Sequence, residues 1–189
     1  LSLATCLPVE RRPTVGRGGG VALAALQLAR VVSAELIVTS SSGAKLARAT
    51  EMGADHAVNY TTNPDVAIAV KDITGGRGVD AVIDTTGAAT WPINFETVRR
   101  GGRIVHCGVT TGAAVEANIS TLYWNHITVM GSTMGSHEDF RHLLEAVHMA
   151  KLRPVMDTTY SLANIRAATE RMEEGQQFGK IVLDLHGTA

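Results

Sequence analysis

Short apolar runs alternate along the chain with longer segments whose apolar residues recur at helical spacing. The runs predict strands over residues 36–39, 56–58, 79–84, 103–107 and 127–130. They are continuous rather than alternating, which is typical of strands covered on both faces. Between them, the periodicity predicts helices over residues 21–32, 44–52, 64–72, 88–98 and 136–151. Asn63 is the expected N-cap of the third helix, and Ser136 with Asp139 forms a capping box on the last.

Strands that alternate with helices predict an α/β fold built on a doubly wound parallel sheet, the Rossmann arrangement. We expect this domain to span residues 14–151. The pattern changes around Leu152-Arg153-Pro154, and residues 152–189 predict a small C-terminal strand–helix–strand appendage. Residues 1–13 show no clean period and are expected to form a leader outside this scheme.

A glycine-rich turn lies between a short first strand at Thr14-Val15 and the first helix. Its sequence is Gly16-Arg17-Gly18-Gly19-Gly20. Glycines let a phosphate approach the backbone, and the free N–H groups and dipole of a helix N-terminus attract an anion. Several βα units follow in order, which favours a dinucleotide phosphate site over a purely structural turn.

The end of the second strand bears on the identity of the dinucleotide. An acidic residue there would bind the adenosine ribose of NAD, but this chain has Thr39-Ser40-Ser41-Ser42, with Lys45 in the next turn. Hydroxyls and an ammonium group can hold a 2′-phosphate, which a carboxylate would repel. The pattern therefore favours NADP(H) over NAD(H), although the serines can also cap the following helix.

Three other strand ends are expected at the same edge of the sheet, where ligands bind in this fold. They are Thr85-Thr86-Gly87, Cys107-Gly108-Val109 and Ser132-Thr133-Met134. Gly87 and Gly108 would allow a dinucleotide to pass close to the backbone. Asp84 is interpreted as a buried strand-end acid satisfied by backbone N–H groups.

Composition excludes several other classes of protein. The formal net charge is -1, which argues against a nucleic-acid or anionic-membrane binder, and no apolar run approaches the ~20 residues of a spanning helix. Two cysteines fit a reducing cytoplasm. The cysteines and seven histidines show no metal-binding spacing, so no zinc is expected in this chain. The absence of a G-x-S-x-G turn removes the nucleophile of a serine hydrolase.

From about Gly18 to Leu185 the chain resembles the medium-chain dehydrogenase/reductases, in the zinc-type alcohol dehydrogenase and quinone oxidoreductase branch. The resemblance rests on GGGVALAALQLAR, KLARATEMGADHAVNY, TGGRGVDAVIDTTGAAT, RRGGRIVHCGVTTG, ITVMGSTMGS, KLRPVMDTTYSL and QFGKIVLDL, in that order. It implies hydride transfer between a nicotinamide cofactor and a small-molecule substrate such as a quinone, enone, aldehyde or alcohol. It also implies a homodimer through the strand near Ile127.

The resemblance places cofactor contacts on particular residues. Phosphate contacts fall on Gly18, Gly19, Gly20 and Val21, and 2′-phosphate contacts on Ser40, Lys45 and Tyr60. Contacts with the adenosine ribose fall on Thr86 and Gly87, and contacts with the nicotinamide end on Gly108, Val109, Ser132 and Thr133. Phe178-Gly179-Lys180 matches a closing motif near the cleft. No residue is assigned as a catalytic acid or base.

The chain departs from the family pattern at its start. Arg17 stands where the phosphate loop has its first small residue, and Ala22 stands at the last glycine. The family's N-terminal GroES-type domain, which supplies the zinc ligands and most of the substrate pocket, has no counterpart in this sequence, and residues 152–189 are expected to pack on such a domain. One alternative is therefore a non-catalytic, truncated dinucleotide-binding module. Another is a Rossmann-like methyltransferase, against which Thr39-Ser40 argues.

Overall fold

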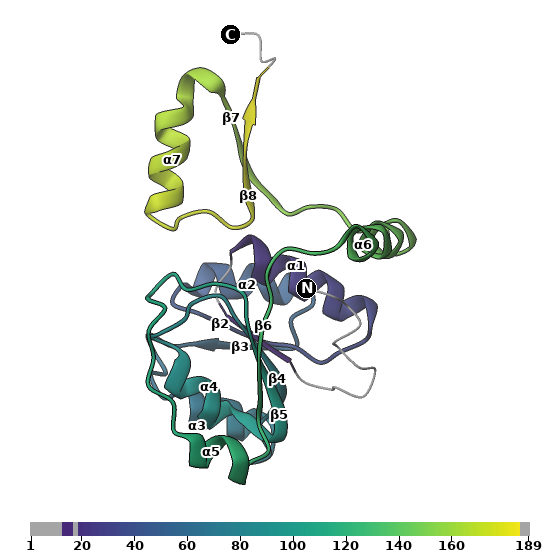
Figure 1. Ribbon diagram of the computed structural model, residues 1–189. Helices are drawn as coiled ribbons and strands as arrows, with labels where there is room; N and C mark the ends of the chain where they lie inside the picture. The colour runs from purple at the N-terminus through teal and green to yellow at the C-terminus, as the bar shows by residue number, and fades with distance from the viewer. Residues whose placement is uncertain (1–12, 17–18, 186–189) are drawn as a thin grey trace.

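The computed structural model of the chain describes residues 13–16 and 19–185 (Figure 1). The strands of its larger sheet are β1 (Pro13–Gly16), β2 (Ile37–Ser40), β3 (His56–Asn59), β4 (Val79–Asp84), β5 (Val98–His106) and β6 (Thr128–Gly131). The helices among them are α1 (Gly20–Val31), α2 (Gly43–Glu51), α3 (Val66–Ile73), α4 (Trp91–Thr97), α5 (Ile119–Trp124) and α6 (His137–Met149). The tail contains β7 (Met156–Ser161), the 3-10 turn η2 (Leu162–Asn164), α7 (Ile165–Glu173) and β8 (Lys180–Asp184).

The larger sheet has the strand order β3-β2-β1-β4-β5-β6, and every neighbouring pair is parallel. The chain therefore winds outward from β1 in one direction and from β4 in the other. Ligands in such sheets bind outside the carboxyl ends of the strands, where the winding direction reverses. This confirms the doubly wound α/β fold and places the expected crevice between β1 and β4.

Helices cover the two faces of this sheet with separate apolar cores (Figure 1). On one face, α1 and α2 pack through Leu26 and Leu46 against sheet residues such as Val38. On the other, α3 packs through Val70 against Val79 and Ile104. Burial on both sides explains why Ala81, Val82 and Ile83 of β4 follow one another without a polar residue. Among the described residues, no helix is long and apolar enough to cross a membrane.

Three sequence expectations were wrong in detail. Asp65, and not Asn63, caps α3, because its carboxylate accepts the Ile68 amide proton at 3.0 Å. The strand β5 begins at Val98 and not at Arg103, so Gly101-Gly102 lies inside it, at a bulge that shifts the pairing register with β4. The helix α5 was not expected, because its six residues are too few to show a helical period.

Helix α6 forms where the sequence predicted it. The capping box of Ser136 and Asp139 is present, with the Ser136 hydroxyl accepting the Asp139 amide proton at 3.1 Å. Its apolar stripe is open, however: Phe140 is 60% and Leu144 51% exposed. The described residues thus leave part of an amphipathic helix without an apolar partner.

The tail forms a small unit of its own, in which β7 and β8 pair in parallel and α7 lies beside them (Figure 1). Phe178 connects this unit to the larger domain, since its side chain is 2% exposed and belongs to the α1–α2 core. The Arg48 guanidinium of α2 lies 4.2 Å from the centre of its ring. Gln27 of α1 also donates to the Arg153 carbonyl at 2.8 Å.

Asp157 ties the tail together from inside. Its carboxylate accepts hydrogen bonds from the Arg171 guanidinium at 2.7 and 3.2 Å and from the Phe178 amide at 2.9 Å. The Arg171 hydrogen bonds lower the pKa of Asp157 from its usual 3.8 to about 2. The same pair raises the pKa of Arg171.

A depressed carboxyl pKa makes the tail's stability depend on pH. The ionised form of Asp157 stabilises the fold above pH 3.8, and this contribution is lost as the pH falls towards about 2. The Asp157→Asn variant lacks this stabilising contribution at every pH. We therefore expect the denaturation midpoints of wild type and D157N to differ near neutral pH and to converge below pH 4. A difference that stays constant over this range would contradict this role.

Candidate functional site

The carboxyl ends of β1, β4 and β5 meet at one edge of the sheet, and α1 begins at the same edge. Gly19 occupies the N-cap position of α1, so no side chain caps the helix from that position, and its first turn holds no acidic residue. The amide groups of this turn and the helix dipole therefore remain available to an anion. Gly18 and Arg17 lie outside the described residues, whereas Gly19, Gly20 and Val21 lie at the predicted place.

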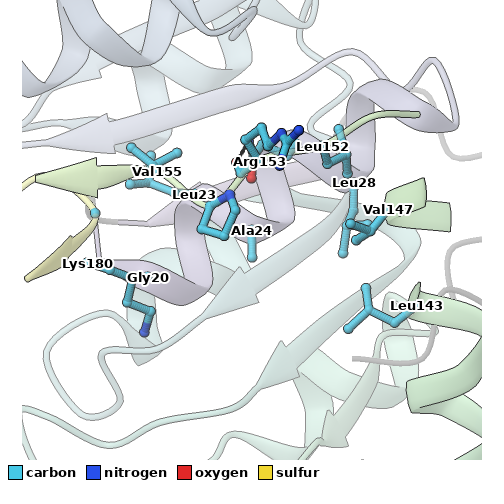
Figure 2. A pocket seen from close by; sticks show the side chains of 13 residues that line it. Gly20, Leu23, Ala24, Leu28, Leu143, Val147, Leu152, Arg153, Val155 and Lys180 are labelled. Atoms are coloured by element: carbon cyan, nitrogen blue, oxygen red, sulfur yellow. Dashed lines mark hydrogen bonds between the residues drawn. The ribbon is translucent and has the colours of Figure 1, made fainter. Parts of the chain in front are cut away.

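Lys180 of the tail reaches this helix end. A β-carbon built on Gly20 would lie 2.7 Å from the Lys180 ammonium nitrogen and 3.0 Å from its ε-carbon. Glycine at position 20 therefore makes room for the lysine side chain, as Figure 2 shows. The result is a positive charge beside the positive end of a helix, an arrangement that complements a diphosphate.

An apolar groove of about 220 Å³ extends from Gly20 along α1. Leu23, Ala24 and Leu28 of α1 form one wall, and Leu143 and Val147 of α6 form the opposite wall (Figure 2). The segment of residues 152–155 closes the remaining side. The groove therefore joins the helix end to the open face of α6.

A second cavity, of about 250 Å³, lies near the carboxyl ends of β2 and β4, between these strands and the helices α3 and α4. Thr39, Tyr60 and Thr86 contribute polar groups to its wall, and Val66 and Ile93 are among its apolar residues. Tyr60 and Thr86, which the sequence assigned to the adenosine end, are thus brought together. An apolar pocket with a few convergent polar groups suits a flat base.

Ser40 and Lys45 line a smaller cavity of about 20 Å³ on the opposite face of the sheet, within the α1–α2 core. The Ser40 hydroxyl accepts the Ser42 amide proton at 3.2 Å, and the Ser42 hydroxyl accepts that of Lys45 at 3.4 Å, so Ser42 caps α2. The Lys45 ammonium donates to the Gly175 carbonyl at 2.5 Å. Ser42 therefore has the capping role that the sequence allowed. To reach a phosphate, the Lys45 ammonium would have to give up its bond to the Gly175 carbonyl.

Asp84 organises the loop that follows β4. Its carboxylate, 4% exposed, accepts hydrogen bonds from the amides of Thr86 and Gly87 at 2.6 and 3.4 Å. The Thr90 hydroxyl and the Asn94 amide group each donate to it at 2.6 Å, and the His106 Nδ1 lies 3.6 Å away. The strand-end interpretation of Asp84 is confirmed, with two side-chain donors that the sequence did not reveal.

The loops after β4 and β5 lie against each other. A β-carbon on Gly87 would lie 2.5 Å from the Gly112 carbonyl oxygen and 3.0 Å from the Val109 α-carbon. One on Gly108 would lie 2.7 Å from the Thr85 carbonyl oxygen. The two glycines predicted for the cofactor thus also allow the loops themselves to approach closely.

The remaining predicted residues lie at the same edge. The Ser132 amide donates to the His106 carbonyl at 2.8 Å, which places Ser132 and Thr133 after β6 and beside the β5 end. Thr111, Thr90 and Asn94 were not predicted. Thr90 and Thr111 lie in segments that carry the family resemblance, but the resemblance gave neither of them a role, and Asn94 lies in a short helix outside those segments.

No metal chemistry is assigned to this edge. Within residues 13–16 and 19–185, no group of three or more His, Cys, Asp or Glu side chains is placed to hold a metal ion. Cys107 is half-buried, and burial raises the pKa of its thiol, which keeps it protonated. The described side chains therefore do not fit a zinc ion.

Comparison with known proteins places this geometry in a family. A family model described as zinc-binding dehydrogenase matches residues 20–149. The chain is 30% identical to an NAD-dependent alcohol dehydrogenase of Sulfolobus acidocaldarius, over 97% of this chain and 53% of that protein. It is also 30% identical to a quinone oxidoreductase of Salmonella typhimurium, over 87% of this chain and 54% of that protein.

Solved structures agree. The alcohol dehydrogenase of Aeropyrum pernix superposes with a TM-score of 0.85 at 26% identity, covering 96% of this chain and 53% of that chain. The chain thus spans about half the length of the relatives that it matches.

Proposed function

The chain belongs to the zinc-binding dehydrogenase family, and we propose that it is the dinucleotide-binding part of an NADP(H)-dependent oxidoreductase. The reaction would transfer a hydride between the nicotinamide and a quinone, enone, aldehyde or alcohol. The observation that carries this proposal is the open N-terminus of α1, with the Lys180 ammonium beside it, at the reversal point of the sheet.

The described residues fit such a cofactor along its length. The first-turn amides of α1 and Lys180 would bind the two phosphates. The cavity lined by Tyr60 and Thr86 would hold the adenosine. The family resemblance puts Gly108 and Val109 at the nicotinamide end. The bound nicotinamide supplies the hydride chemistry, whereas the protein orients it and excludes water.

The preference for NADP(H) rests on the end of β2. The strand ends in Ser40, with Lys45 in the first turn of the next helix, and Lys45 lines the same small cavity as Ser40. Moving the Lys45 ammonium from the Gly175 carbonyl to a phosphate exchanges a neutral partner for a charged one, which strengthens the hydrogen bond.

Lys45→Met tests this preference while keeping the alkyl chain. Losing one charge-assisted bond should weaken NADPH binding about tenfold and leave NADH binding unchanged. Titration of the tryptophan fluorescence with each nucleotide measures both dissociation constants. Lys71→Met, at an exposed lysine near the end of α3, is the matched control. Equal losses for NADPH and NADH would refute the 2′-phosphate role.

We further propose that residues 152–189, together with the open face of α6, pack against a substrate-binding domain of a longer protein. The exposed Phe140 and Leu144 and the groove of Figure 2 support this, as does the greater length of the relatives. Turnover of a quinone or enone panel by this chain alone would contradict that division. It would equally exclude a non-catalytic module.

A homodimer through β6 is the last part of the proposal. This strand lies at the end of the sheet order, and Val129 is 39% exposed. Neighbouring α5 presents Ile119, Tyr123 and Trp124, all more than half exposed. An open strand edge with apolar side chains is suited to pairing with a second copy.

Val129→Lys should convert this dimer to a monomer, because a charge on the edge strand opposes pairing. Size-exclusion chromatography with light scattering should then show the mass halved. Val31→Lys, at a similarly exposed position on α1 (41%), should leave the dimer intact. A monomeric wild type, or a V129K variant that remains dimeric, would contradict a dimer interface at β6.

A further inference from the structure

Two loops meet at the candidate site, the β4–α4 loop (residues 85–90) and the β5–α5 loop (residues 107–118). The Ala88 amide donates to the Gly112 carbonyl at 3.0 Å. At the far end, the Trp91 indole N–H donates to the Glu116 carbonyl at 2.8 Å. The contact is close because Gly87, with a φ of 91°, has no side chain to separate the loops.

Thr111 joins the two loops most fully. Its hydroxyl donates to the Thr86 carbonyl at 2.8 Å and accepts the Ala89 amide proton at 3.0 Å. Its own amide donates to the same Thr86 carbonyl at 2.9 Å. A single threonine thus bonds to the residues on both sides of Gly87.

The β4–α4 loop is also bonded to Asp84, the last residue of β4. The Asp84 carboxylate receives hydrogen bonds from the loop amides and from Thr90. The β5–α5 loop is bonded to Asp84 only at its start, where the Cys107 amide donates to the Asp84 carbonyl at 2.9 Å, and residues 109–120 are exposed throughout. Thr111 therefore hydrogen-bonds the exposed β5–α5 loop to the loop that Asp84 orders.

We propose that Thr111 is a positioning residue that holds the β4–α4 loop and the β5–α5 loop together before the cofactor binds. The first of these loops would contact the adenosine ribose, and the second would contact the nicotinamide end. The inference rests on the proposed function, since it concerns the same dinucleotide. Loops that are already ordered lose less conformational entropy when the dinucleotide binds, so binding is tighter. This link should matter most to a ligand that spans both loops.

Two ligands separate this role from general support of the fold. NADPH would contact both loops, whereas adenosine 2′,5′-bisphosphate would reach only the adenosine side. Thr111→Val removes the hydroxyl bonds and keeps the shape. We expect it to weaken NADPH binding about fivefold to tenfold and the bisphosphate by less than twofold. Thr111→Ser should restore NADPH binding, and Thr110→Val, at the exposed neighbour, should resemble wild type.

The readout is the dissociation constant, measured from tryptophan emission in a Trp124→Phe background so that Trp91 reports alone. An unchanged NADPH affinity in T111V would overturn the proposal. Equal losses for both ligands would also overturn it, because they indicate local damage rather than coupling of the loops.

Hydrogen exchange in the wild type gives a test that needs no substitution. The amides of Ala88 and Ala89 should already be protected without nucleotide, since their acceptors lie on the other loop. Amides that exchange freely until NADPH is added would show that the ligand orders the loops, which contradicts the proposal. If wild type binds neither ligand, the proposed function fails, while this exchange result still decides the role of Thr111.

Discussion

Gly87→Ala should lower the free energy of unfolding by about 3 kcal/mol, through backbone strain and overpacking together. Position 87 has a φ of 91°, which an alanine adopts only with strain. The added β-carbon would also lie 2.5 Å from the Gly112 carbonyl oxygen. Relieving that contact must separate the loops after β4 and β5, so we expect NADPH binding to be lost as well.

Chemical denaturation followed by circular dichroism measures this change. Gly76→Ala is the matched control, because Gly76 has a φ of 81° and open space around its α-carbon. It should show the strain alone, about 1 kcal/mol, and keep its nucleotide affinity. If G87A were no less stable than G76A, the close packing of the loops would not be a property of the folded protein.

Asp84→Ala should lower the free energy of unfolding by about 3 to 5 kcal/mol, because it removes the acceptor that several buried donors share. Thr86, Thr90 and Asn94 each donate to this carboxylate at 2.6 Å. Alanine leaves the Thr86 amide and the Asn94 side-chain amide without this acceptor and leaves a small void beneath the loop, whereas the Thr90 hydroxyl can still donate to the Gly87 carbonyl at 3.0 Å. The β4–α4 loop should then lose its order together with its stability.

The control for this variant is Asp65→Ala. Asp65 is also an acceptor of a backbone amide, but it is an exposed N-cap, so its loss should cost about 1 kcal/mol. Both variants can be measured by the same denaturation experiment. A D84A chain within about 1 kcal/mol of wild type would mean that the donors find other partners.

The sequence predicted the sheet well because its information is periodic and local. Burial on both faces leaves uninterrupted apolar residues in the middle of a strand, as at Ala81-Val82-Ile83 of β4. The caps of α2 and α6 are local too, because the Ser42 and Ser136 hydroxyls accept amide protons from residues only three positions further along the chain. The helix α5 and the β5 bulge at Gly101-Gly102 were not foreseen. A short exposed helix and a register shift depend on tertiary contacts rather than on local pattern.

The candidate site was predicted in its strand ends and not in its long-range contacts. Tyr60 and Thr86 were assigned to one region and line one cavity. The contact of Lys180 with Gly20 joins residues 160 positions apart, and the bonds of Thr111 to Thr86 join two exposed loops. Nothing in the local sequence signals such pairs, because each depends on how the whole chain folds back on itself.

The most direct test of the account is to map the amide groups that change when the 189-residue chain is titrated with NADPH. Two-dimensional NMR of labelled protein would follow each amide. We predict saturable shifts at the first turn of α1, at Thr86-Gly87 and at Gly108-Val109, all at the carboxyl edge of the sheet. The absence of saturable shifts, or shifts confined to the groove between α1 and α6, would contradict it.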